Sequence, residues 1–325
     1  MTERIAADLE QGAMPAVILA GSDRRPGPVP PGARAHDFLA GYKGAEIEIG
    51  GRPIVQFVRE RLIESGCFSC VLVAGPGSVY EPMAPGAVID TDRDLGHNLR
   101  RIFAACQWSA RLCIASCDIV PAAADVRAAL DLWKAAGGPD FWVPLVEIPP
   151  DLGASAWKPK YGIKPGPDEP ARLYLPGHLG VLDLRAVRTG FLCKMIALIY
   201  RLRNRELERR RKIIFGLVVG DLLGQDLLNM FRLRLPTMTW TALKRGWRLY
   251  SRLRQGRLSL AELEDALTEL LIRGDRRRRG AVRFTPCDLE SLARDLDTVG
   301  EVAEHGGRWR GKREGLPCER AGPGH

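Results

Sequence analysis

The stretch PAVILAGSDRRPG, residues 15–27, joins a short apolar run to a loop that carries two arginines. Residues 16–20 are apolar and partly β-branched, which predicts a buried strand. Gly21 lets the backbone approach a ligand, and Arg24 and Arg25 place positive charge beyond the strand. In a parallel α/β sheet, ligands bind at this edge. The stretch therefore predicts an anion-binding loop, although an ordinary turn with solvated arginines explains the loop equally well when it is taken alone.

Apolar runs of strand length alternate with segments of helical periodicity through the first half of the chain. This alternation predicts a mostly parallel α/β sheet. The predicted strands are 16–20, 70–74, 87–90, 112–116 and 141–146, with further strands at 179–184 and 281–285, and the predicted helices are 53–65, 99–108 and 123–136.

The composition changes after residue 149 and divides the chain. Residues 149–178 are rich in Pro, Gly and Lys and predict a long loop or a few irregular strands. We expect residues 1–185 to form the first part of the core, 186–272 a helical insertion, 273–305 a return to the core, and 306–325 a flexible tail.

Length and composition favour a cytoplasmic globular protein. The chain has 325 residues, of which 46% are hydrophobic, and it contains no apolar run long enough to cross a membrane. Its beginning lacks the apolar core of a signal peptide. The eight cysteines are predicted to be free thiols, and we expect the C-x-x-C pair of Cys67 and Cys70 to pack rather than to act in redox chemistry.

The net charge of +9 allows an anionic partner of three kinds: nucleic acid, a membrane surface or a phosphorylated substrate. The basic runs lie at 201–212, 244–257 and 276–279. Since no recognised nucleic-acid motif is present, no nucleic-acid partner is expected. The basic helical insertion could make weak contact with an anionic membrane surface, but packing against the sheet is the preferred interpretation.

Charged residues also occur near the predicted ends of other elements. Lys43 precedes a short strand and a Gly-Gly turn, and Asp118 ends the apolar run of CIASCDIVP, residues 113–121. Asp295 and Asp297 lie in ARDLDTVGEV, residues 293–302.

These motifs together resemble the MobA-like nucleotidyltransferases, in the superfamily of nucleotide-diphospho-sugar transferases. The resemblance covers roughly residues 15–185 and 280–304. The matching positions are Leu19, Ala20, Gly21 and Ser22, then Lys43, the segment Gly51, Arg52, Pro53 and Ile54, then Asn98 with Leu99, Asp118 with Pro121, and Asp295, Leu296, Asp297 and Thr298.

The chain departs from the family pattern at several positions. Ser22 and Arg24 replace glycines of the loop, and Val299 stands where proline is usual. Glu301 falls where the second acid of the closing motif is expected, and His178 follows Gly177 where relatives often have asparagine.

The resemblance implies a Rossmann-like three-layer α/β sandwich with a mostly parallel sheet and a helical insertion. It implies Mg²⁺-dependent transfer of a nucleoside monophosphate from an NTP to a phosphorylated small-molecule acceptor, with release of pyrophosphate. Its implied site residues are Lys43 and Arg25 for catalysis, Leu19, Ala20, Gly21, Ser22, Arg24 and Asn98 for the nucleotide, Asp118 and Asp297 for the metal, and Lys160 and His178 for the acceptor.

Two other functions stay open on the sequence. A glycosyltransferase of related fold would hold its metal through D-x-D, which Asp90 and Asp92 offer. A degenerate nucleotide-binding module without catalysis is favoured by Ser22 and Val299.

Overall fold

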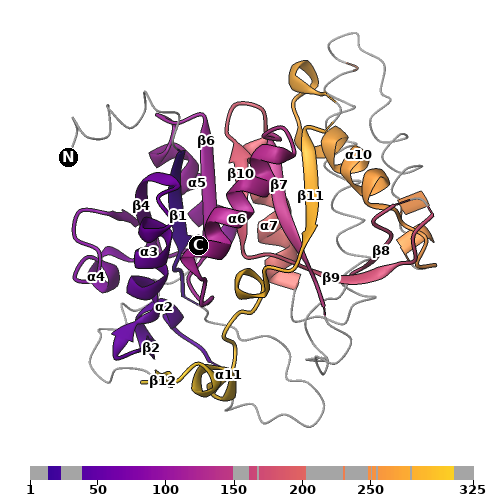
Figure 1. Ribbon diagram of the computed structural model, residues 1–325. Helices are drawn as coiled ribbons and strands as arrows, with labels where there is room; N and C mark the ends of the chain where they lie inside the picture. The colour runs from indigo at the N-terminus through magenta and orange to yellow at the C-terminus, as the bar shows by residue number, and fades with distance from the viewer. Residues whose placement is uncertain are drawn as a thin grey trace.

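The protein has a central sheet with helices on both faces (Figure 1). The computed structural model describes residues 14–22, 39–148, 161–166, 168–202, 230, 248–249, 251–253, 255–278 and 280–310. Among these residues no helix is long and apolar enough to cross a membrane.

The central sheet has nine strands, in the order β5-β4-β1-β6-β10-β7-β9-β8, and β11 also pairs with β7. Strands β5, β4, β1 and β6 are mutually parallel, and β10 is antiparallel to both β6 and β7. Strand β7 therefore runs in the same direction as β6, so their carboxyl ends share one edge. The bounds are β1 (Met14–Leu19), β4 (Phe68–Gly75), β5 (Val88–Asp90), β6 (Arg111–Ser116), β7 (Phe141–Glu147), β8 (Tyr161–Ile163), β9 (Arg172–Pro176), β10 (Leu179–Asp183) and β11 (Val282–Cys287).

Helices cover both faces because the strands are apolar on both sides. In β1, Ala16 and Ile18 belong to the core beneath α3 (Ile54–Glu64) and α6 (Ala123–Ala135), whereas Val17 belongs to the core beneath α5 (Leu95–Ala105) and α7 (Thr189–Leu202). Successive strand residues point to opposite faces, so this alternation is that of a sheet buried on both sides. The predicted three-layer α/β sandwich is confirmed.

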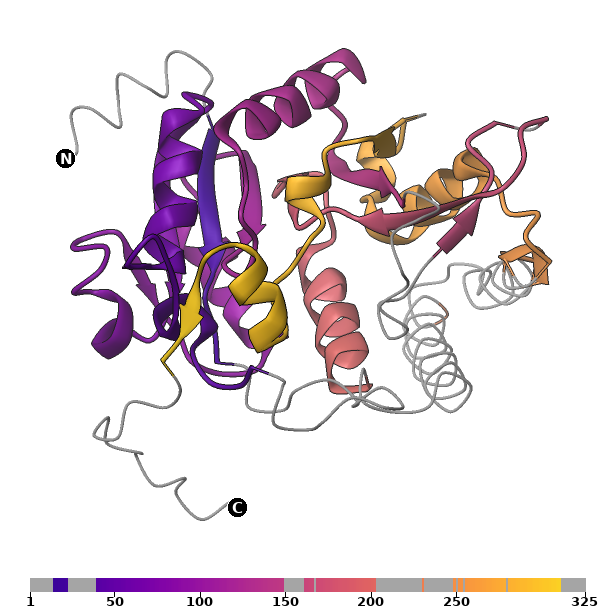
Figure 2. The ribbon, with the colours of Figure 1, turned by 60° about the horizontal axis from the view of Figure 1, so that its bottom comes forward.

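The remaining elements are short, apart from α10 (Leu260–Leu271), which packs against β11. A second sheet has the order β12-β2-β3, so β12, near residue 309, pairs with β2, near residue 48. Figure 2 shows α11 and β12 against the N-terminal part of the chain. The bounds are α2 (Lys43–Glu46), β2 (Ile47–Ile49), β3 (Arg52–Pro53), α4 (Gly77–Tyr80), η2 (Gly274–Arg276), η3 (Glu290–Leu292), α11 (Val299–Glu304) and β12 (Arg308–Trp309).

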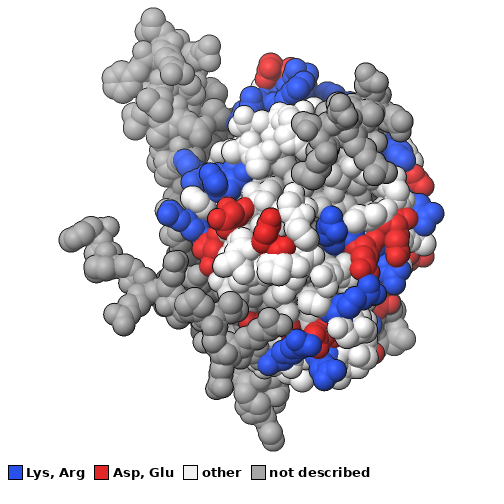
Figure 3. Space-filling model, turned by 90° about the vertical axis from the view of Figure 1, so that its left-hand side faces the viewer, with Lys and Arg blue, Asp and Glu red and all other residues white. Residues whose placement is uncertain are grey.

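The structure bears on two of the sequence predictions, namely the helical insertion and the clustering of basic residues. Helices α7 and α10 lie within the predicted insertion, but most of residues 203–254, which prompted the idea of membrane contact, lie outside the described residues. On the face in Figure 3, basic and acidic side chains are interspersed, and the described residues form no continuous basic patch there.

Candidate functional site

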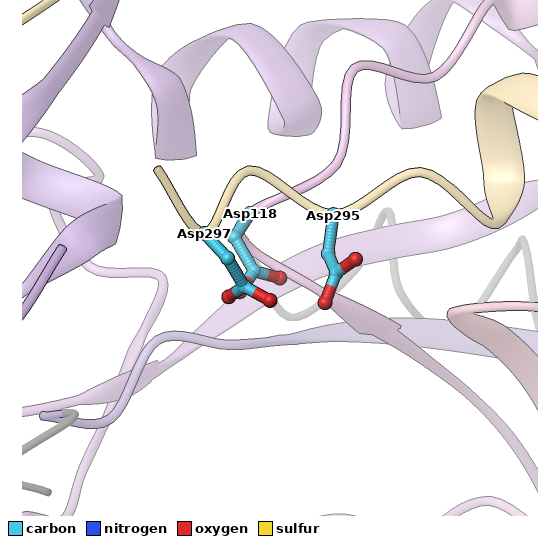
Figure 4. A group of neighbouring side chains, drawn as sticks. All are labelled: Asp118, Asp295 and Asp297. Atoms are coloured by element: carbon cyan, nitrogen blue, oxygen red, sulfur yellow. The ribbon is translucent and has the colours of Figure 1, made fainter. Parts of the chain in front are cut away.

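The returning chain brings two aspartates beside the end of β6. The backbone N–H of Leu296 donates to the carbonyl of Asp118 at 2.7 Å, and Ile119 and Asp295 form an antiparallel bridge. Residues 295 and 297 are two apart in this extended segment, so they face the same side. This pairing places Asp295 and Asp297 next to Asp118 (Figure 4).

The three carboxylates form one cluster at the carboxyl edge of the sheet. Each offers an oxygen, and these oxygens lie within 4.8 Å of one another. Figure 4 shows the side chains of Asp118, Asp295 and Asp297 directed to the same side of the chain. Their side chains are 17%, 17% and 22% exposed, so the cluster is shielded but still reached by solvent.

Lys43 is the cation of this cluster. Its Nζ lies 2.5 Å from Oδ1 of Asp297 and 3.5 Å from Oδ2 of Asp118. The side chain is only 7% exposed, and it comes from the start of α2, which follows a turn at Gly41. A buried ammonium is retained where charged partners compensate its lost hydration. Lys43, which was predicted to bind phosphate, thus lies next to the two aspartates that were predicted to bind the metal.

The surroundings of Asp118 favour its ionised form. Burial by itself raises the pKa of this carboxyl, but the charges of Lys43 and His178 and the hydroxyl of Ser116 lower it, and the net pKa is below the ordinary value. Ser116 donates to Oδ1 of Asp118, and Lys43 lies on the Oδ2 side. Asp118 is therefore an anionic, oriented carboxylate.

The donor set fits a hard divalent cation. Mg²⁺ prefers carboxylate oxygens together with waters and phosphate oxygens, and it is usually bound through one or two protein carboxylates. Asp118 and Asp297 supply two, and Asp295 adds a third that the family resemblance did not assign to the metal. The i, i+2 spacing of the two C-terminal aspartates on an extended chain is the sequence signal that could have identified Asp295.

A capping box fixes the backbone at Asp297. The Oε2 atom of Glu301 accepts from the backbone N–H groups of Asp297 at 2.8 Å and Thr298 at 2.9 Å, while the Thr298 hydroxyl accepts from the N–H of Glu301 at 3.2 Å. Glu301 and Val299, which depart from the family motif, thus lie in the first turn of α11. Here the glutamate orients the backbone of the segment that carries Asp297 instead of joining the acidic cluster.

Three of the predicted nucleotide-binding residues of the first loop line one cavity. The cavity has a volume of about 880 Å³, and Leu19, Gly21, Ser22 and Lys43 line it together with the three aspartates. Ala20 is buried in the core, and its N–H donates to the carbonyl of Ala74 at 2.8 Å. Ala20 therefore supports the loop from beneath, and its own N–H is already committed.

Asn98 lines the cavity but its amide is used to hold a neighbouring loop. Its Oδ1 accepts from the hydroxyl of Thr91 at 2.7 Å and the N–H of Arg93 at 3.0 Å, and its Nδ2 donates to the carbonyl of Arg93 at 3.1 Å. A Cβ at Gly21 would lie only 3.1 Å from Nδ2. The absence of a side chain at Gly21 thus allows the loop to approach Asn98.

Of the four remaining predicted site residues, one lies at the cavity and three lie outside the described residues. His178 lines the cavity, with Nε2 at 4.0 Å from Oδ2 of Asp295. Arg24, Arg25 and Lys160 lie outside the described residues.

The D-x-D pair is held by hydrogen bonds outside the acidic cluster, although Asp92 lines the same cavity. Oδ1 of Asp90 accepts from the N–H of Gly77 at 2.7 Å, and Oδ2 of Asp92 accepts from the hydroxyl of Tyr42 at 2.9 Å. Neither belongs to the acidic cluster found among the described residues. Asp92 instead steadies the residue that precedes Lys43.

Comparison with known proteins supports the fold. No family model matches the chain, so the MobA-like resemblance gains no support there, and no curated protein matches either. A solved structure described as a hypothetical transferase from Thermus thermophilus is 21% identical, with a TM-score of 0.58, covering 89% of this chain and 99% of that one. This chain therefore shares the α/β fold of that structure.

Two further solved structures are more distant. CMP:2-keto-3-deoxy-manno-octonic acid synthetase complexed with CTP is 12% identical, with a TM-score of 0.40 and coverage of 64% of this chain and 86% of that one. A mannose-1-phosphate geranyltransferase, also from Thermus thermophilus, is 16% identical, with a TM-score of 0.38 and coverage of 61% and 66%.

Proposed function

We propose that the protein is a nucleotidyltransferase, which transfers a nucleoside monophosphate from an NTP to a phosphorylated small-molecule acceptor and releases pyrophosphate. The observation that carries the proposal is the convergence of Asp118, Asp295, Asp297 and Lys43 on a cavity that Gly21 also lines. Anion-binding backbone, a cation and metal-binding carboxylates at one sheet edge are the parts that phosphoryl-group chemistry requires. The motif order of a MobA-like enzyme adds support.

The reaction needs no general base. An oxygen of the acceptor phosphate is anionic at neutral pH, and it attacks the α-phosphorus while the bond to the α,β-bridging oxygen breaks. Pyrophosphate leaves with that bonding electron pair. Catalysis then depends on position and on neutralised charge.

The residues of the site divide this work. Asp118 and Asp297 would hold Mg²⁺, with Asp295 beside them, and the bound metal would supply charge neutralisation for the phosphate oxygens. Lys43 would offer its ammonium to the same phosphate oxygens. The Gly21 loop receives the triphosphate, with Arg24 or Arg25 reaching its distal end, and Asn98 holds the wall of the nucleotide pocket. His178 lies where the acceptor phosphate would enter.

The glycosyltransferase and the module without catalysis would each require different residues of this fold. A glycosyltransferase would rely on Asp90 and Asp92, whose carboxylates accept hydrogen bonds from Gly77 and Tyr42. A module without catalysis has no need of three clustered carboxylates around a buried lysine. Ser22 leaves the loop open to the cavity, so its departure from glycine does not close the site.

Pyrophosphate release tests the proposal. The protein is incubated with each of the four NTPs, Mg²⁺ and a panel of phosphorylated acceptors, and pyrophosphate is measured. We expect release that requires one NTP, one acceptor and the metal. Turnover of a preformed nucleotide sugar without pyrophosphate would support the glycosyltransferase, and NTP binding without any turnover would support the module.

A further inference from the structure

The cavity of the candidate site extends past the charged cluster into an apolar end. This end lies between the sheet and helix α7, at the side of β10. It is lined by Leu182 of β10 and by Leu192, Ile196 and Tyr200 of α7, whereas Leu99 and Phe103 of α5, a helix that packs against β4 and β5, line the same cavity from the side of β4. The charged lining residues, Lys43, the three aspartates and the segment 92–94, gather at the other end, and His178 lies with them.

A glycine makes room for this apolar end. Leu182 points toward α7, so Gly180, two residues earlier in β10, lies on the same face of the sheet. Gly180 lines the cavity, and a Cβ at this position would lie 3.1 Å from the carbonyl oxygen of Trp142 in β7, so the glycine relieves crowding against β7 and adds no side chain to the cavity. The space therefore begins next to His178 and continues along the inner side of α7.

The strand order places the part of this space beside β10 and α7 across Asp118 from the nucleotide loop. Asp118 follows β6, which has β1 and the Gly21 loop on one side and β10 on the other. A nucleotide held by the loop lies on the β1 side of Asp118, so the β10 side is left to the acceptor. The acceptor phosphate meets the charged end, and the rest of the acceptor extends between β10 and α7.

The lining restricts what can occupy that side. Hydroxyl groups buried without hydrogen-bond partners are costly, so a sugar or polyol is poorly matched to a wall of leucine, isoleucine and phenylalanine side chains. A hydrocarbon group gains free energy there by leaving water. Building on the proposed function, we propose that the acceptor is a phosphomonoester of a hydrophobic alcohol, with its hydrocarbon group between β10 and α7.

Binding of alkyl phosphates of increasing length tests this. Ethyl, butyl, hexyl and octyl phosphate are titrated into the full chain by calorimetry below their aggregation concentrations, with Mg²⁺ present. Glucose 1-phosphate is the polar comparison. We expect the Kd to fall roughly fourfold for each added methylene that is buried, and hexyl phosphate to bind more tightly than glucose 1-phosphate. Affinity that does not change with chain length, or that favours the sugar phosphate, would overturn the proposal.

A pair of variants locates the binding. Ile196→Trp fills the apolar end, whereas Ile199→Trp changes a residue of the same helix that is 46% exposed and does not line the cavity. We expect Ile196→Trp to weaken octyl phosphate binding at least tenfold, with ethyl phosphate and NTP affinities unchanged, and Ile199→Trp to leave all of them unchanged. A loss of NTP affinity in Ile196→Trp would assign the apolar end to the nucleobase and overturn the proposal.

The alkyl phosphate titration does not depend on turnover. If no NTP is consumed and the chain-length dependence still appears, nucleotidyl transfer fails while the hydrophobic-phosphate site stands. If an NTP is consumed and the Kd does not depend on chain length, nucleotidyl transfer stands and the hydrophobic-phosphate site fails. Tyr200 lines the cavity and is 38% exposed. Tyr200→Ala gives a second variant should the tryptophan disturb folding, and it is expected to weaken the binding of octyl phosphate more than that of ethyl phosphate.

Discussion

The ammonium of Lys43 lies 2.5 Å from the carboxylate of Asp297, although 254 residues separate them in the chain. This contact joins residue 43, in the first core segment, to residue 297, in the last one. A second contact strengthens the connection, because the N–H of Leu39 donates to the carbonyl of Asp297 at 2.9 Å. The segment that returns to the core after the helical region thus completes both the fold and the cluster.

Replacing Lys43 tests whether it serves the fold and the reaction together. Lys43→Met keeps most of the side-chain volume and removes the charge, so Asp118 and Asp297 lose their buried cation. We expect the free energy of unfolding in metal-free buffer to fall by about 3 kcal/mol and NTP turnover to fall by roughly a hundredfold or more. Urea unfolding and pyrophosphate release measure the two effects. Unchanged turnover in the folded variant would remove Lys43 from the site.

The burial of Lys43 could not be read from the sequence. A lysine near a predicted phosphate site reads as an exposed ligand, whose replacement would leave folding intact. Its burial follows from the turn before α2 and from the approach of Asp297, and both depend on contacts across the whole chain. Local patterns cannot supply such long-range contacts.

The sheet could be predicted where its strands are buried on both faces. Such strands appear as unbroken apolar runs, as in residues 112–116 and 141–146, and the structure has β6 and β7 there. Strand β8 and the pairing of β12 with β2 were not predicted, because they are short and depend on partners far along the chain. For the same reason the acidic cluster was predicted as two aspartates and contains three.

The departure at Val299 predicts a stabilising substitution. Val299 is the first helical residue of α11, is 42% exposed, and follows Thr298 with ψ 158°. Proline suits the first helical position, and an extended preceding residue is what proline requires. We expect Val299→Pro to raise the free energy of unfolding by about 0.5 kcal/mol, as measured by urea unfolding.

A proline further along the same helix provides the comparison for this substitution. Val302→Pro removes the N–H that donates to the carbonyl of Thr298 at 3.2 Å, so it is expected to destabilise. A destabilising Val299→Pro would show that the helix does not begin where this geometry places it.

The D-x-D pair gives a prediction that separates the glycosyltransferase from the nucleotidyltransferase. Asp90→Asn leaves an amide oxygen that still accepts from the N–H of Gly77, so the local structure is expected to survive. We expect no change in the Mg²⁺ concentration needed for half-maximal turnover. A large increase in that concentration would place the metal at Asp90 and Asp92 instead.

Acid unfolding reports the charge state of Asp118. Its pKa in the folded protein is below the ordinary value of 3.8, so ionisation favours the fold. The resulting contribution to the free energy of unfolding is complete above the pKa that Asp118 has in the unfolded chain. It is lost as the pH falls through the lower pKa of Asp118 in the folded protein. We expect the stability difference between the wild type and Asp118→Asn to shrink from about pH 5 to about pH 2.

The control for the acid series is a carboxylate outside the cluster. Asp131 is 70% exposed on α6 and pairs only with Lys134 among the contacts described there. Asp131→Asn is expected to differ little from the wild type at every pH in the series. A wild-type advantage over Asp118→Asn that grows on acidification would contradict the sign derived for Asp118.

Metal binding should be visible without turnover. Three carboxylates within 4.8 Å face one lysine, so a divalent cation that binds only the folded chain raises its stability by mass action. At a Mg²⁺ concentration about a hundred times the Kd, we expect a gain of about 2.7 kcal/mol, seen as a rise in Tm of roughly 5 °C over the EDTA-treated protein.

The three aspartates are then compared one at a time as asparagine variants. We expect Asp118→Asn and Asp297→Asn each to lose most of the Mg²⁺-dependent rise in Tm and roughly a hundredfold or more in turnover, because the metal contributes several kcal/mol to the transition state. Asp295 lies beside His178, with 4.0 Å between Oδ2 and Nε2, and Asp295→Asn is expected to keep part of the rise in Tm. If Asp295→Asn lost the rise completely while Asp297→Asn kept it, the metal would lie on the His178 side of the cluster, and Asp297 would serve only to hold Lys43.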